Sequence, residues 1–120
     1  MGVAEKLDEL EQLSLGFQES IRKEPRHAGD RVMAMREKFN DVCVSLVQEM
    51  VGDPRIAANR ELFEAMQNAI EKLRNRVNAH QIKWNATRIE QDPQGYFDSV
   101  QPLNDLLREF VTNARVFVRD

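Results

Sequence analysis

Three clusters of proline and glycine divide this chain into four segments, and within each segment apolar residues recur every three or four positions. The clusters are EPRHAGD at 24–30, GDP at 52–54 and QDPQG at 91–95. A spacing of three and four places apolar side chains on one face of an α-helix. No segment shows the sustained alternation of period two that is typical of a strand. The spacing therefore predicts an all-α protein.

The segments predict four helices, at about 3–23, 30–51, 54–90 and 99–118. The pairs Asp53-Pro54 and Asp92-Pro93 indicate helix starts, because aspartate caps a first turn and proline fits its first position. Pro102 limits the last helix to a start near residue 99, which leaves 93–98 as a turn or a short separate helix. Four amphipathic helices with short connections bury their apolar faces most simply as an antiparallel up-down four-helix bundle.

The composition predicts one globular domain spanning residues 1–120, with 42% hydrophobic residues and 31% charged residues of both signs. A net charge of −3 gives no general attraction to a phosphate backbone. No apolar run approaches the roughly 18 to 20 residues that cross a bilayer, and the N-terminus lacks the apolar core of a signal peptide. We therefore expect a cytoplasmic protein that binds neither nucleic acid nor membrane.

Few residues in this chain could carry catalysis or bind a metal. The single cysteine, Cys43, lies among apolar residues of the second segment, where a thiol is normally inert. The Glu-x-x-His pairs of metal-binding bundles are missing, apart from Glu24 and His27, which span Pro25. Methionines on the apolar faces are typical core residues rather than haem ligands. The sequence thus predicts a non-enzymatic protein without metal or cofactor.

One segment, AHQIKWNATRI at 79–89, carries a recognisable pattern. It resembles the phosphoacceptor segment of histidine-phosphotransfer domains, in which Ala-His is followed by an aliphatic residue and then by lysine. The resemblance implies that His80 carries the phosphoryl group, that Lys83 helps to neutralise it and that Gln81 lies at the rim. The glycine that this family has at the fourth position after the histidine is Trp84 here.

Helical geometry gives His80 a different role. At about 100° per residue, a continuous helix places His80 and Trp84 on the core face. His80 would then be a partly packed residue at the rim, with one ring nitrogen bonded to water or a carbonyl. Ile82 and Ile89 lie about 180° to 200° from that face. A helix that is apolar on two faces suggests a docking surface, and the predicted interaction surface comprises Ile82, Trp84, Ala86 and Ile89.

The leading functional hypothesis is a small non-enzymatic helical-bundle interaction module, such as a regulator, an adaptor or a chaperone-like protein. It would bind a protein partner, or associate with itself to form an oligomer, through apolar helix faces. One alternative is a histidine-phosphotransfer-like signalling domain that uses His80. A second alternative is the excised ligand-sensing bundle of a receptor.

Overall fold

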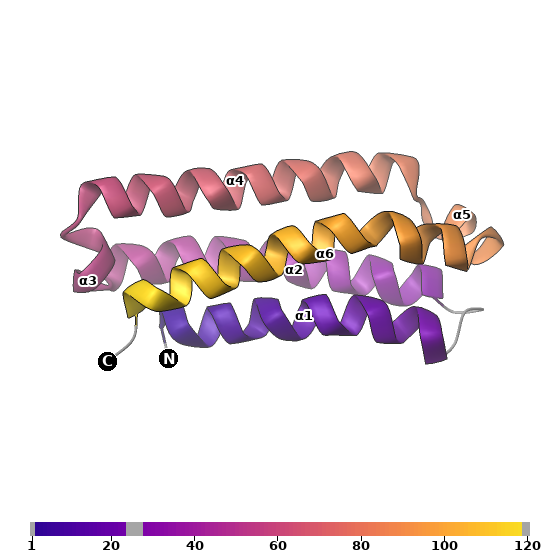
Figure 1. Ribbon diagram of the computed structural model, residues 1–120, viewed down its shortest axis with the longest axis horizontal. Coiled ribbons are helices and arrows are strands. Elements are labelled where there is room, and N and C mark those ends of the chain that lie inside the picture. Colours follow the sequence, from indigo (N-terminus) through magenta and orange to yellow (C-terminus); the bar gives the residue numbers. More distant parts are fainter. Residues whose placement is uncertain (1, 24–27, 119–120) are drawn as a thin grey trace.

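The computed structural model describes residues 2–23 and 28–118 and shows an all-helical chain (Figure 1). The long helices are α1 (Val3–Lys23), α2 (Ala28–Gly52), α4 (Arg60–Lys83) and α6 (Pro93–Arg115). The short elements are α3 (Pro54–Ala57), α5 (Ala86–Gln91) and the 3-10 helix η2 (Val116–Val118). No strand occurs in the described ranges, so the all-α prediction is confirmed there.

The four long helices lie lengthwise along a molecule of 48 × 23 × 19 Å (Figure 1). Helix α1 packs closely on both α2 and α6, whereas α4 has a smaller contact with α6 and a smaller one still with α2. The short helix α5 packs on α2. This approach is close, because a Cβ added at Gly29 of α2 would lie 2.6 Å from the carbonyl oxygen of Ala86.

The predicted continuous helix at 54–90 is wrong, because the chain leaves the helical conformation twice within it. Asn59 caps α4 by accepting a hydrogen bond from the backbone N–H of Leu62 at 3.2 Å. Asn85 caps α5 in the same way through the N–H of Arg88, at 2.9 Å. Asparagine side chains compete with the helical backbone for hydrogen bonds, so both residues favour a new start over continuation.

The predicted start of the last helix near residue 99 is also wrong. Helix α6 begins at Pro93, and Asp92 caps it by accepting from the N–H of Gly95 at 3.0 Å. Pro102 therefore lies inside the helix, at a cost of about 3 kcal/mol in a typical helix interior. The turns before it bury Tyr96 and Val100, and this burial offsets the hydrogen bond that Pro102 cannot make.

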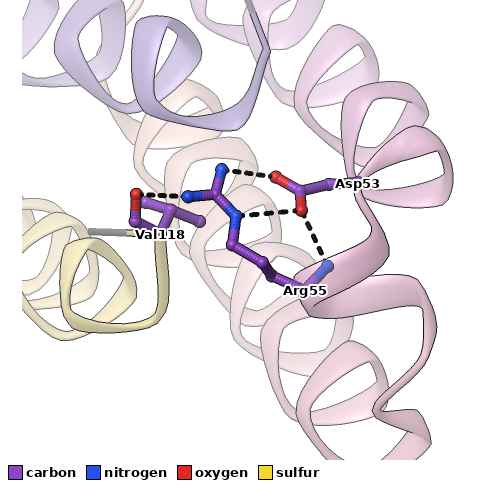
Figure 2. Close-up of polar contacts among 3 residues, drawn as sticks. All are labelled: Asp53, Arg55 and Val118. Carbon is purple, nitrogen blue, oxygen red and sulfur yellow. Dashed lines mark hydrogen bonds and ion pairs between the residues drawn. The ribbon is translucent and has the colours of Figure 1, made fainter. Parts of the chain in front are cut away.

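An arginine joins η2 to the connection between α2 and α3 (Figure 2). Arg55 donates from Nη1 to the carbonyl oxygen of Val118 at 2.8 Å, and from Nη2 to Oδ2 of Asp53 at 2.9 Å. Asp53 also accepts from the backbone N–H of Arg55, so a single carboxylate caps α3 and orients the guanidinium. Hydrogen bonds from Arg55 hold the pKa of Asp53 below its usual value.

Candidate functional site

His80 lies in the last turn of α4 and is half-buried between two aromatic rings. Its ring centroid lies 5.3 Å from that of Tyr96 and 6.4 Å from that of Trp84. Its Nε2 is 2.9 Å from Oγ of Ser99 on α6. Burial, followed by the charges of Arg36 and Lys83, lowers the pKa of His80 to about 4. The imidazole is therefore neutral at pH 7 and bonded to a neighbouring helix.

These contacts match the packed-rim interpretation of His80 better than the phosphoacceptor interpretation. One of the two ring nitrogens, Nε2, is already bonded to Oγ of Ser99. The residue that should be buried behind a phosphoacceptor, Ile82, is instead 84% exposed. Lys83 and Gln81 are close to His80 in the chain. The resemblance places Gln81 at the rim, whereas its Nε2 is buried without a hydrogen-bond partner. Phosphotransfer stays a prediction from the sequence alone.

The predicted interaction surface does not form as one exposed patch. Ile82 is exposed, but Trp84 and Ile89 are buried in the core and Ala86 is half-buried. The prediction assumed a continuous helix, whereas Trp84 ends α4 with φ −121° and ψ 82°. The break turns α5 relative to α4, so Ile89 faces inward where a straight helix would have turned it outward.

Two arginines bind the carbonyl groups at the end of α4. Arg36 of α2 donates from Nη1 to the carbonyl oxygen of Trp84 at 2.9 Å. Arg88 of α5 donates to the carbonyl oxygen of Lys83 at 2.7 Å, and its guanidinium lies 4.3 Å from the centroid of the Trp84 indole ring. The last carbonyls of a helix lack partners within the helix and carry partial negative charge. The two cations therefore stabilise the break between α4 and α5.

The sequence interpretation missed Arg36, which is buried although it is charged. The signal was present, since Arg36 follows Val32 by four positions and precedes Phe39 by three. It therefore occupies an apolar-face position of α2, between two core residues. A basic residue at such a position indicates a buried partner on another element. Tyr96 is one such partner, with its ring centroid 5.9 Å from the guanidinium.

A groove runs along the seam between α4 and α6. Its larger part has a volume of about 330 Å³. The apolar side chains that line this part are Leu62, Ala65, Met66, Ala69, Leu73, Leu106, Phe110, Ala114 and Phe117. A second hollow of about 240 Å³ shares Leu106 with it and is lined by Arg76, Lys83, His80 and Ser99. The seam is therefore apolar toward η2 and basic toward the end of α4.

The described residues contain no group of three or more His, Cys, Asp or Glu side chains that could hold a metal ion. Cys43 is buried, as predicted, and burial raises the pKa of its thiol to about 12. The thiolate needed for nucleophilic attack is therefore not formed at neutral pH. Glu24 and His27 lie outside the described residues.

In the part of the chain that the structure describes, no helix combines the length and the apolar character needed to cross a bilayer.

Comparison with known proteins finds no family model, no curated protein and no solved structure that matches the chain. The α4–α6 seam and the cluster around His80 are therefore the features from which a function can be inferred.

Proposed function

We propose that this protein is a small interaction module, an antiparallel up-down four-helix bundle that binds an amphipathic helix of a protein partner in the groove between α4 and α6. The observation that carries the proposal is the apolar groove of about 330 Å³ along this seam. Amphipathic helices bind in such grooves by inserting side chains spaced at i, i+3, i+4 and i+7. The smaller contacts of α4, compared with those of α1, are consistent with a seam that another helix completes.

Charge along the seam favours one kind of partner helix. Arg76 and Lys83 line the hollow at one end, and among the residues that the structure describes no carboxylate lines it. The apolar part carries Lys72 and Glu109, one charge of each sign. A helix with an apolar face and a glutamate cluster at one end would place its carboxylates against Arg76 and Lys83. Such complementarity selects orientation and partner more than it adds affinity.

The proposal replaces the predicted surface at 82–89 with the seam. It keeps the predicted class of function, a non-enzymatic module that binds protein, and the predicted cytoplasmic location. The single cysteine is compatible with a reducing compartment. No specific contact favours the receptor-bundle alternative.

The test uses two synthetic helical peptides with the same apolar face, one ending in three glutamates and one ending in three lysines. Fluorescence anisotropy measures the binding of each labelled peptide to the protein. We expect the glutamate peptide to bind at least about tenfold more tightly, a difference of about 1.4 kcal/mol. Equal binding of both peptides, or of neither, would contradict the proposal.

Two variants locate the binding surface. Phe117 lines the groove and is 49% exposed, whereas Val44 is 46% exposed on α2 and does not line it. Phe117→Asp should weaken peptide binding, and Val44→Asp should leave it unchanged. Sedimentation velocity tests self-association. A dimer that Phe117→Asp dissociates would show that a second copy of this chain, rather than another protein, occupies the groove.

A further inference from the structure

A small cavity lies next to the seam groove, with which it shares Leu73, Leu103 and His80, and polar side chains line part of it. Its volume is about 20 Å³, enough for one occupant of about the size of a water molecule. Most of its wall is apolar, but Arg36, His80, Tyr96 and Asn104 also line it. These four residues come from α2, α4 and α6.

Two nitrogen atoms of the lining residues have no hydrogen-bond partner. They are Nη2 of Arg36 and Nδ2 of Asn104, and their side chains belong to residues that are only 5% and 2% exposed. Both atoms are donors, so the occupant that would satisfy them must accept hydrogen bonds. A buried donor without a partner typically costs about 1 to 3 kcal/mol, more for a charged group.

The charge of Arg36 is the second independent observation. Among the described residues no carboxylate forms an ion pair with it, although buried charges are normally paired. The end of α4 supplies a partial negative charge, equivalent to about half an elementary charge, through the Trp84 carbonyl. Tyr96 interacts with the guanidinium, but burial raises the pKa of its phenol and keeps it neutral. Within the described residues, part of the positive charge of Arg36 is therefore left without an opposite charge.

We propose that this cavity binds a small monovalent anion of the size of chloride, held by Nη2 of Arg36 and Nδ2 of Asn104. An anion accepts from both donors and neutralises the guanidinium. A water molecule would also accept from both donors, and the hydroxyl of Tyr96 and Oδ1 of Asn104 offer acceptors for its hydrogens. Water is neutral, however, and would leave the buried charge of Arg36 without an opposite charge.

Bromide provides a direct test on the native chain. Crystals grown in sodium bromide should give an anomalous difference peak inside the cavity, at hydrogen-bond distance from Nη2 of Arg36 and Nδ2 of Asn104. Density in the cavity without anomalous signal would identify water and overturn the proposal. Bromide found only on the protein surface would overturn it as well.

A solution test compares thermal unfolding in sodium chloride and in sodium gluconate at equal ionic strength. Chloride at ten times its Kd should shift the folding equilibrium about tenfold, which raises the Tm by roughly 5 °C. Asn104→Asp places a carboxylate beside Arg36 and should abolish this difference between the two salts. If Asn104→Asp fails to fold, Asn104→Leu serves the same purpose by removing a donor.

Ser14→Ala is the matched control, because Ser14 Oγ is also buried without a partner but does not line the cavity. This variant should keep the difference between chloride and gluconate. The same difference in the native chain, in Ser14→Ala and in Asn104→Asp would show a general salt effect and overturn the proposal.

Discussion

The environment of His80 predicts a protein that loses stability as the pH falls below 6.5. Burial is the largest cause of its lowered pKa, and the charges of Arg36 and Lys83 add to it. In the unfolded chain the imidazole has its ordinary pKa of about 6.5. Between pH 6.5 and about 4 the unfolded state therefore binds a proton that the folded state does not bind. Protons bound only by the unfolded state favour unfolding, so stability falls with pH across this window.

The expected loss follows from the two pKa values. If the folded pKa of His80 is about 4, the free energy of unfolding is about 2 kcal/mol lower at pH 5 than at pH 7. His80 is only half-buried, and water screens part of the effect, so we expect a loss of about 1 to 1.5 kcal/mol. His80→Gln removes the titrating group and should remove this part of the pH dependence.

Urea unfolding at pH 7, 6 and 5 measures the effect as the difference between the native chain and His80→Gln. Ser99→Ala is the control, because burial and the charge of Arg36 remain and the pH dependence should persist. Titration of the His80 ring protons by NMR gives the folded pKa directly. A folded pKa at or above 6.5, or a stability difference that does not change with pH, would refute the reasoning.

Three further predictions test the core and the chain ends. Cys43 should not react with a thiol reagent such as dithionitrobenzoate in the folded protein, because the side chain is buried and its pKa is about 12. It should react fully in concentrated guanidinium. Rapid reaction without denaturant would contradict the burial of Cys43. Ile82→Asp should change the free energy of unfolding by no more than about 0.5 kcal/mol, because Ile82 is exposed. Ile89→Asp should lower it by about 4 kcal/mol or more, because Ile89 is buried, and urea unfolding measures both. Equal effects would show that one helix continues from α4 through α5. Arg55→Ala should lower the free energy of unfolding by about 1 kcal/mol and speed amide exchange in η2, because it removes the hydrogen bond to the Val118 carbonyl. Unchanged amide exchange would mean that this hydrogen bond does not hold η2 in place.

The sequence predicted the helical class and most of the core well because both depend on the spacing of apolar residues. Leu7, Phe39, Leu73 and Leu107 are buried, and each has another apolar residue three or four positions away in the sequence. The helix boundaries were harder to predict. Apolar spacing continues through residues 84–85, and only the capping preference of Asn85 indicates a break.

The candidate sites were predicted less well than the fold, for two physical reasons. A single helical break reverses the face that a residue presents, so Ile89 moved from the expected surface into the core while Ile82 stayed exposed. The seam groove arises from the distance between α4 and α6, and no local pattern encodes that distance. Arg36 was missed although it could have been predicted, because a cation at an apolar-face position is visible in the sequence itself.

The unequal packing of α4 has a consequence for how the molecule opens. Proteins unfold locally in cooperative units, and the unit with the least buried contact opens at the lowest free energy. Among the four long helices that unit is α4, which is joined to the rest through its smaller contacts with α6, α3 and α2 and through the two arginines at its end. We expect helices α1 and α2, which share the largest contact, to open last. A helix bound in the seam would therefore stabilise α4 against local opening. It would slow amide exchange along all of α4 and not only where the two helices are in contact.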